Sequence, residues 1–296
     1  AEEPDNRLAR DIVGKSRIMP FGLLLFGNSS VGKSSFTDIL FSYSAKILNQ
    51  KDEAEYKYTR NFRDPFWSGF KSHKWFILLD DVGSIKPSAV NGTDPSVDEI
   101  ISLMNTVSLL CNMADLSEKG RVAARPLVVV ATSNHPWMNV QHYAYHPSAL
   151  MRRFPFRVTA TVKKQYQMDN APTMLDPAKC IVDYTTSYPD FWNITVDKIL
   201  ATPLPTDGSQ PACEPIVINE LQEVGMSKFL PWYREKLIKH MESQKSIKSK
   251  METMAKVQMC SHDLPIGNCD VCTQLQVGER LIANYWPSLS VKERIV

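Results

Sequence analysis

Short apolar runs alternate with helix-type patterns through the first half of the chain. Residues 21–26, 75–79 and 126–131 are nearly continuous apolar runs, and residues 156–162 alternate between apolar and polar. Runs of this length are typical of strands buried on both faces. Apolar residues at helical spacing follow the first run and recur through residues 98–113. This alternation predicts an α/β fold with a central parallel sheet flanked by helices.

The pattern changes after residue 165. Residues 166–228 are rich in Pro, Thr and aromatic residues without regular spacing, and we expect an irregular segment packed on the core, because exposing its aromatic side chains is unfavourable. Helical spacing returns in a Lys-rich stretch, which predicts one long amphipathic helix at residues 229–257. The lysines of this helix are interpreted as a solvated face, with RNA contact as the alternative.

Composition narrows the class of protein. The chain has 296 residues, 43% of them hydrophobic, a net charge of +2 and six cysteines, too few for a disulfide framework. The apolar runs are far shorter than the roughly 20 residues of a transmembrane helix. The charged N-terminal residues lack the apolar stretch of a secretory signal. We therefore expect a cytosolic protein whose overall charge does not indicate a nucleic acid partner.

The run at residues 21–26 leads into GNSSVGKS, which has the G-x-x-x-x-G-K-S pattern of a phosphate loop. Backbone amides of such a loop point at phosphate oxygens, and the following helix adds its positive N-terminus. Lys33 is expected to contact the terminal phosphates of ATP, and Ser34 to bind Mg²⁺. The predicted nucleotide-binding residues are Gly27, Asn28, Ser29, Ser30, Val31, Gly32, Lys33, Ser34 and Ser35. The alternative is a chance match in a turn rich in Gly and Ser.

Polar residues end two further apolar runs. Asp80 and Asp81 follow the run at residues 75–79, and Asn134 closely follows the run at residues 126–131. Beside a phosphate loop, Asp80 is predicted to orient Mg²⁺ and Asp81 to position or deprotonate the attacking water. The neutral Asn134 amide can hydrogen-bond this water and the γ-phosphate without adding repulsive charge. Taken singly, such residues are ordinarily explained as turn formers.

Four candidate metal ligands cluster near the C-terminus. Cys260 and His262 form C-x-H, Cys269 and Cys272 form C-x-x-C, and six residues separate the two pairs. Four nitrogen and sulfur ligands at this spacing suit a closed tetrahedral Zn²⁺ site. Buried free thiols and chance proximity are the alternatives.

The ordered motifs resemble the superfamily 3 helicases, specifically the replication ATPase of picorna-like viruses. GNSSVGKS resembles its Walker A, FWSGFKSHKWFILLDD its lead into a Walker B ending in Asp-Asp, and SEKGRVAARPLVVVATSN its B′ element running into motif C. ALMRRFPFRV resembles its arginine-finger stretch, and the motifs together cover about residues 18–160. Most other hexameric ATPases have Glu in the second Walker B position.

This resemblance implies an AAA+-like P-loop ATPase that assembles into a ring, most often a hexamer, with ATP bound between subunits. It implies that Arg152 and Arg153 enter the site of the neighbouring subunit, where a guanidinium neutralises charge on the γ-phosphate. Lys119 and Arg121 are expected on a loop facing the central channel, in contact with the phosphate backbone of single-stranded RNA. Without the motifs, a basic helix end and a solvated turn would explain these residues.

The resemblance also concerns both ends of the chain. Family members carry a Cys-rich zinc module here, although the His ligand departs from the commonest all-Cys version. Their final helix docks on the next subunit, and Tyr285 and Trp286 are its expected anchors. Family members usually begin with an amphipathic membrane-binding helix that this sequence lacks, so we expect a fragment whose membrane attachment depends on the missing region.

The expected organisation follows from these patterns and the resemblance. A superfamily 3 P-loop ATPase core is expected at residues 1–165, and the packed segment at residues 166–228. The long helix at residues 229–257, a small zinc-binding module at 258–275 and an oligomerisation helix at 276–296 complete the chain.

The leading hypothesis is a viral nonstructural NTPase and RNA helicase, processed from a polyprotein, that hydrolyses ATP with Mg²⁺ in a ring and acts on single-stranded RNA during genome replication. It would work with other viral replication proteins in the host cytoplasm, at intracellular membranes. The alternative is an ATPase that remodels membranes or protein partners and binds RNA as an ATP-independent chaperone. A cellular ring ATPase is a third hypothesis, disfavoured by the missing Glu after the Walker B Asp.

Overall fold

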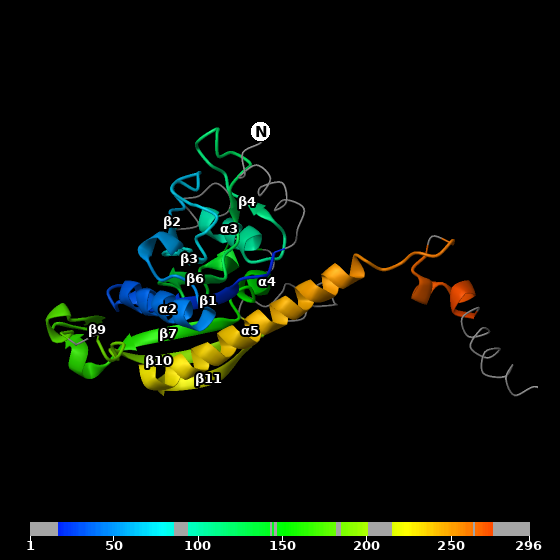
Figure 1. Cartoon of the computed structure of the whole chain (residues 1–296). Coiled ribbons are helices and arrows are strands. Elements are labelled where there is room, and N and C mark those ends of the chain that lie inside the picture. Colours follow the sequence, from blue (N-terminus) through cyan, green and yellow to red (C-terminus); the bar gives the residue numbers. More distant parts are fainter. Residues whose placement is uncertain are drawn as a thin grey trace, which may run out of the picture. The chain divides into compact units, whose positions relative to one another are not determined.

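The computed structural model describes residues 17–85, 94–142, 144, 147–181, 185–200, 215–262 and 264–274. The chain divides into two units, residues 1–245 and residues 246–296. The first unit contains the central sheet, and the second contains the candidate metal ligands (Figure 1).

Seven strands of the described residues form one central sheet in the spatial order β11-β10-β7-β1-β6-β3-β2 (Figure 1). The five strands from β7 to β2 pair in parallel, whereas β10 pairs antiparallel with β7, and β11 pairs antiparallel with β10. Because β1 lies between β6 and β7, its carboxyl end is a switch point of the kind where open α/β sheets bind ligands. The strands are β1 (Phe21–Phe26), β2 (Lys57–Arg60), β3 (Phe76–Leu79), β6 (Val128–Ser133), β7 (Phe156–Val162), β10 (Trp192–Ile199) and β11 (Val217–Val224).

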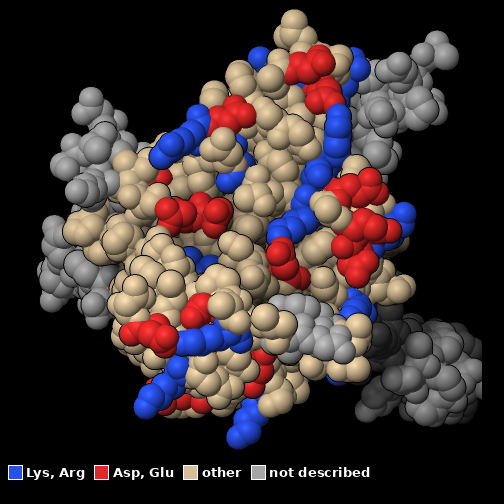
Figure 2. Space-filling view, turned by 90° about the vertical axis from the view of Figure 1, so that its left-hand side faces the viewer, with Lys and Arg blue, Asp and Glu red and all other residues tan. Residues whose placement is uncertain are grey.

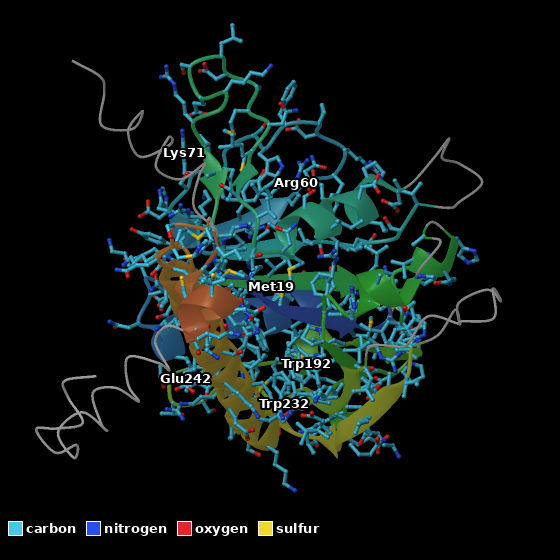
Figure 3. All side chains as sticks on the ribbon, turned by 90° about the vertical axis from the view of Figure 1, so that its right-hand side faces the viewer. Met19, Arg60, Lys71, Trp192, Trp232 and Glu242 are labelled. Carbon is cyan, nitrogen blue, oxygen red and sulfur yellow. The ribbon has the colours of Figure 1, made fainter. Side chains whose placement is uncertain are left out.

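Helices cover both faces of this sheet. Leu23 and Leu25 of β1 are buried in one apolar layer and Leu24 is buried in the other, as the alternation of side chains along a strand requires. Trp192 and Trp232 lie on the side of the first layer, and Arg60 lies on the side of the second (Figure 3). The first layer contains side chains of α2 (Lys33–Leu48) and of the first part of α5 (Met226–Met254), and the second contains side chains of α3 (Pro95–Leu103) and α4 (Pro147–Met151).

Short elements complete the described part of the chain. Two small antiparallel pairs are formed by β4 (Leu109–Leu110) with β5 (Ala123–Ala124) and by β8 (Gln167–Met168) with β9 (Ala171–Leu175). We call the second pair the β8–β9 hairpin. The 3₁₀ turns are η1 (Ala54–Tyr56), η3 (Val140–His142), η4 (Lys164–Tyr166), η5 (Pro177–Lys179) and η6 (Ile266–Asn268).

The described part of residues 166–228 packs on the core as expected, but the expectation that it is irregular is wrong. This segment contributes the β8–β9 hairpin and the two antiparallel strands β10 and β11. In β10 the alternate residues Trp192, Ile194 and Val196 are fully buried, which is the pattern of an ordinary strand. At the edge of the sheet β11 instead leaves Val217 and Ile218 exposed, so its sequence shows no clear alternation.

The helix expected through residues 98–113 ends early. α3 stops at Leu103, where the Arg17 guanidinium donates hydrogen bonds to the carbonyls of Ser102 and Leu103 at 2.8 and 2.7 Å. Terminal carbonyls of the helix are thereby satisfied by a side chain from a distant part of the sequence. The long helix predicted at residues 229–257 is present as α5, a few residues earlier in the chain. None of the helices in the described ranges combines the length and apolar character needed to cross a membrane.

Candidate nucleotide site and metal centre

The phosphate loop connects β1 to α2 through two residues in the left-handed region. Ser30 has a φ of 63° and Gly32 a φ of 87°. Gly32 is the N-cap of α2, and its carbonyl accepts a hydrogen bond from the amide of Phe36 at 3.0 Å. The helix therefore begins directly at Lys33 with its N-terminal amides at the loop, an arrangement that favours phosphate binding. Lys33 Nζ donates hydrogen bonds to the carbonyls of Gly27 and Asn28 at 2.8 and 3.1 Å.

Lys33, Asp81 and Asn134 meet in one hydrogen-bonded chain. Lys33 Nζ donates to Asn134 Oδ1 at 2.6 Å, and Asn134 Nδ2 donates to Asp81 Oδ1 at 2.8 Å. Asp80 joins through Thr132, whose hydroxyl donates to Asp80 Oδ1 at 2.7 Å and accepts from the amide of Asp81 at 2.9 Å. The adjacent strands β3 and β6 bring these residues together beside the end of β1. We call Asp80, Asp81, Thr132 and Asn134 the motif flank.

The loops that follow β3 and β6 are also joined through their backbones. The amide of Val82 donates to the carbonyl of Thr132 at 2.8 Å, and Ser133 Oγ donates to the carbonyl of Val82 at 2.7 Å. A β-carbon on Gly83, which has a φ of 71°, would collide with the backbone of Met138. The acidic and amide groups of the motif flank are therefore held by two loops that fit tightly together.

The motif flank is open to a charged ligand. Asp80, Asp81 and Asn134 are exposed, and Lys33 is partly buried. Desolvation lowers the pKa of Lys33 from its ordinary value of 10.5, and the nearby carboxylates of Asp81 and Asp80 oppose this shift. Ser34 lies exposed in the first turn of α2. Its hydroxyl and the two carboxylates are oxygen donors of the type that Mg²⁺ prefers, so the donor set fits this ion.

The opposite side of the phosphate loop is supported by residues outside the predicted motifs. Trp192 Nε1 donates to the carbonyl of Val31 at 2.6 Å, and this contact is buried. The amide of Leu175 donates to the carbonyl of Ser30 at 2.9 Å. A β-carbon on Gly32 would approach both side chains, at 3.2 Å from Trp192 and 2.9 Å from Leu175. We call β7, the β8–β9 hairpin and Trp192 the hairpin flank.

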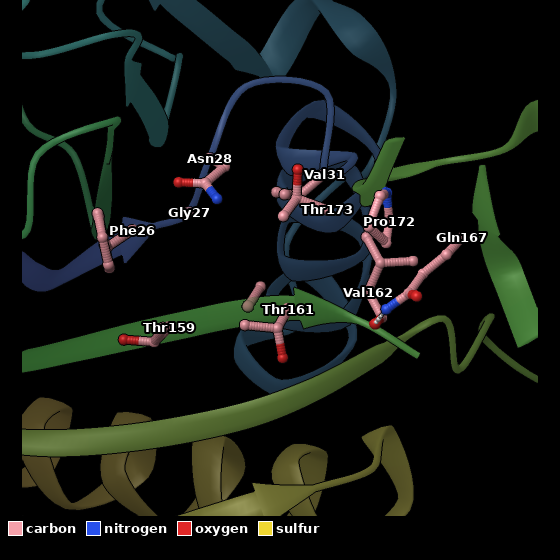
Figure 4. Close-up of a pocket in the computed structure, with 11 residues that line it drawn as sticks. Phe26, Gly27, Asn28, Val31, Thr159, Thr161, Val162, Gln167, Pro172 and Thr173 are labelled. Carbon is pink, nitrogen blue, oxygen red and sulfur yellow. Dashed lines mark hydrogen bonds between the residues drawn. The ribbon is translucent and has the colours of Figure 1, made fainter. Parts of the chain in front are cut away.

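A cavity of about 210 Å³ lies between the phosphate loop and the hairpin flank (Figure 4). Its lining includes Gly27, Asn28 and Val31 of the loop, Thr159 and Thr161 of β7, and Gln167, Pro172 and Thr173 of the hairpin. The alternation at residues 156–162 predicted the strand β7 of this flank, but the β8–β9 hairpin and the place of Trp192 beside the loop were not predicted. The alternation that begins at Trp192 was the available signal, but the Pro-rich and Thr-rich surroundings obscured it.

The structure does not bring Arg152 and Arg153 to the phosphate loop of the same chain. The carbonyl of Arg153 lies against Gly22 near the start of β1, whereas the loop follows the end of that strand. Arg153 Nη1 donates to the carbonyl of Met104 at 2.7 Å, and desolvation, followed by repulsion from Arg152, lowers its pKa. Arg152 is exposed and makes no such anchoring contact within the described residues. The two arginines therefore differ, because Arg153 is held by a hydrogen bond within its own subunit, whereas the side chain of Arg152 is accessible to solvent.

Lys119 and Arg121 are exposed in the turn between β4 and β5. Gly120 between them has a φ of 74°, and the amide of Arg121 donates to the carbonyl of Glu118 at 3.0 Å. Glu118 also pairs with Lys71. In the face that Figure 2 displays, basic and acidic side chains are interspersed, without one large basic area. Tyr285 and Trp286, the expected oligomerisation anchors, lie outside the described residues.

The second unit brings Cys260, His262, Cys269 and Cys272 together. Their ligand atoms all lie within 4.8 Å of one another, and His262 Nδ1 lies 3.7, 3.5 and 3.7 Å from the three sulfur atoms in chain order. Tetrahedral Zn²⁺, with Zn–S near ~2.3 Å and Zn–N near ~2.0 Å, requires N···S separations of about 3.5 Å. The four donors therefore fit zinc.

The thiols of this cluster have different acidities. Hydrogen bonding from the backbone of His262 lowers the pKa of Cys260 to about 6. Desolvation and hydrogen bonds with Cys269 and Cys260 raise the pKa of Cys272 to about 11. Three thiolates this close together would repel one another, so ionising all three is unfavourable unless a cation binds between them.

A mostly parallel α/β sheet with a phosphate loop after β1 fits a superfamily 3 helicase, and comparisons with known proteins agree. Residues 23–135 match the family model described as RNA helicase. The RNA1 polyprotein of broad bean wilt virus 1 is 30% identical over 56% of this chain and 9% of the polyprotein. The replicase polyprotein of acute bee paralysis virus is 28% identical over 47% and 7%, and the genome polyprotein of human hepatitis A virus genotype IB is 31% identical over 48% and 6%.

The matches cover less than a tenth of the length of these curated relatives. Together with the motifs and the fold, these similarities support the resemblance of residues 23–135 to a picorna-like superfamily 3 helicase.

Proposed function

We propose that this chain is a Mg²⁺-dependent ATPase that forms a ring and acts on single-stranded RNA during viral genome replication. The observation that carries the proposal is the hydrogen-bonded chain from Lys33 through Asn134 to Asp81. It joins the phosphate loop to the two neighbouring strands at the switch point of the sheet. A cation, a neutral amide and a carboxylate in this order are the groups required around a γ-phosphate and its attacking water.

Each group has a distinct part in hydrolysis. The loop amides and Lys33 bind the phosphates and neutralise their charge. Ser34 and Asp80 would hold Mg²⁺, which supplies further charge neutralisation when bound. Asp81 accepts a proton from the attacking water or orients it, and Asn134 donates its amide hydrogens without adding negative charge. The left-handed backbone of Asp81, with a φ of 54°, aims its carboxylate at Asn134.

In the proposed ring, a neighbouring subunit would supply the arginine of the site. Arg152 is exposed and adjoins Arg153, whose carbonyl lies near the start of β1, at the other end of the strand from the phosphate loop, so the Arg152 guanidinium would serve a γ-phosphate in a neighbouring subunit. Arg153 then positions this segment through its hydrogen bond to Met104. Repeated around a ring, the exposed Lys119 and Arg121 would line a channel that contacts the RNA backbone without sequence preference.

The second unit and the cellular setting complete the proposal. Cys260, His262, Cys269 and Cys272 hold Zn²⁺ in a closed structural site. The viral relatives, one of which is named a replicase polyprotein, imply work in the host cytoplasm with other replication proteins.

The test compares Lys33→Ala with Lys46→Ala, a matched change near the other end of the same helix. Lys33→Ala should reduce ATP hydrolysis on the order of a thousandfold, because the γ-phosphate loses its cation. Lys46→Ala should keep wild-type turnover. Equal activity of all three proteins would overturn the catalytic assignment.

The same variants distinguish helicase from chaperone activity. Strand displacement that needs ATP and is lost in Lys33→Ala supports the helicase. Strand annealing that persists in Lys33→Ala, without ATP-dependent displacement, indicates instead an ATPase with a separate RNA chaperone activity.

A further inference from the structure

The cavity on the hairpin flank has no part in the roles assigned above. It begins at the phosphate loop, with which it shares Gly27, Asn28 and Val31, and it extends between β7 and the β8–β9 hairpin (Figure 4). We propose that this cavity binds the nucleoside end of the triphosphate, its base and ribose. This inference rests on the proposed nucleotide site and adds where the rest of the ligand lies.

The direction of the ligand follows from the order of the strands. β1 has β6 and then β3 on one side and β7 on the other. Lys33, Asp81 and Asn134 gather on the β6 side, so the terminal phosphate belongs there. A triphosphate that crosses the loop from this point must leave it on the β7 side. The cavity opens at that position.

The chemistry of the lining favours a nucleoside over further phosphate. All eleven described residues that line the cavity are uncharged. A phosphate there would lack a cationic partner, whereas the apolar surfaces of Val31, Val162 and Pro172 can pack against a base. Hydroxyl groups of Thr159 and Thr173 are of the type that hydrogen-bonds a ribose or a base edge, whereas the hydroxyl of Thr161 donates to the carbonyl of Asn193 at 3.3 Å.

The cavity is built as a defined site. Gln167 Nε2 donates to the carbonyl of Val162 at 2.8 Å, which fixes the amide at one wall. The hydrogen bond from Leu175 to the carbonyl of Ser30 ties the hairpin to the phosphate loop itself. A nucleoside in the cavity therefore contacts the same loop that binds its phosphates. The hairpin belongs to the nucleotide site although it lies outside the family match at residues 23–135.

Photoaffinity labelling tests this placement directly. The full chain is irradiated with 8-azido-ATP, whose reactive group is on the base, with and without excess ATP. Labelling that ATP prevents should fall on residues 159–175. ATP-protected labelling confined to the motif flank, or to any other part of the chain, would overturn the proposal. Absence of any ATP-protected labelling would overturn both the subsite and the nucleotide site.

A cavity-filling variant separates the two proposals by a second measurement. Thr173→Phe places a ring in the cavity from an exposed position of β9 and should raise KM for ATP about tenfold, corresponding to ~1.4 kcal/mol, with kcat nearly unchanged. Thr59→Phe, at an exposed position of β2, is the matched control and should leave KM unchanged. Wild-type hydrolysis with an unaltered KM in Thr173→Phe would refute the subsite alone, whereas wild-type protein without hydrolysis would refute the proposed function.

Discussion

The two flanks of the phosphate loop hold it in different ways. On the motif flank, polar side chains meet one another, and Asp80, Asp81 and Asn134 remain exposed. On the hairpin flank, a buried indole and a backbone amide bind the carbonyls of the loop itself. The first flank carries the groups that we propose act on the nucleotide, and the second hydrogen-bonds the loop that would bind its phosphates. A phosphate loop is thus specified partly by residues far from its motif.

The largest expected effect lies on the motif flank. Asp81→Asn keeps the shape of the side chain but removes its basicity, so kcat for ATP should fall about a thousandfold with KM nearly unchanged. Steady-state hydrolysis measures both constants. Asp98→Asn, an exposed position on α3, is the matched control and should behave as wild type. A wild-type kcat in Asp81→Asn would remove the proton-accepting role from this flank.

Asn134→Ala should have the next largest effect. It breaks the link between Lys33 and Asp81 and removes an amide from the γ-phosphate, so single-turnover hydrolysis should slow about a hundredfold. Asn134→Asp should be at least as slow, because it adds negative charge where charge develops. A fast Asn134→Asp variant would show that neutrality at this position does not matter.

Trp192→Phe tests the hairpin flank with a smaller expected change. A smaller aromatic ring replaces the indole and the donor to the carbonyl of Val31 is lost, so KM for ATP should rise about fivefold to tenfold while kcat changes little. Trp75→Phe is the matched control, because Trp75 is also buried and its Nε1 donates to the carbonyl of Lys51 at 2.9 Å, remote from the phosphate loop.

Both tryptophan variants should lose thermal stability, which unfolding measurements can compare. Only Trp192→Phe should change KM. A similar KM in the two variants would mean that Trp192 serves the core and not the loop, and the distinction between the flanks would fail.

The smallest expected effect is a shift in pH dependence. Desolvation lowers the pKa of Lys33, so this side chain loses its positive charge at a lower pH than an ordinary lysine does. Binding of a fluorescent ATP analogue should therefore begin to weaken at that lower pH. Asp81 opposes this shift, and its removal in Asp81→Asn should move the alkaline limb to still lower pH. Trp192→Phe should leave the position of the limb unchanged. A limb that moves equally in both variants would contradict the assignment to Lys33.

The elements of the motif flank could be predicted because their signals are local. A continuous buried strand followed by Asp-Asp, or by Ser-Asn, remains recognisable wherever the strand lies in the sheet. β6 pairs with β1, and β3 pairs with β6, so β3 is one strand removed from β1, yet its Asp81 still connects to Lys33 through Asn134. The roles of Lys33, Asp80, Asp81 and Asn134 remain proposals, while their proximity is a structural fact.

The missed elements depend on contacts that no local pattern encodes. α3 ends where the guanidinium of Arg17, some 85 residues earlier, donates hydrogen bonds to the last carbonyls of the helix. The apolar residues nevertheless continue at helical spacing beyond Leu103. Trp192 contacts Val31 across 161 positions of sequence. The edge strand β11 shows no clear alternation, because Val217 and Ile218 are exposed while Leu221 and Val224 are partly buried against the first apolar layer. Long-range hydrogen bonding and edge position, rather than weak propensity, explain these errors.

Gly83 has a consequence for how this molecule can move. Its position against the backbone of Met138 is closed to every residue that has a β-carbon, and Asn139 Nδ2 fastens the same joint by donating to the carbonyl of Gly83 at 2.7 Å. The turns after β3 and β6 must therefore travel as one rigid piece. A nucleotide that binds here would therefore meet carboxylate and amide groups whose spacing is preorganised, and little free energy would be spent on ordering them.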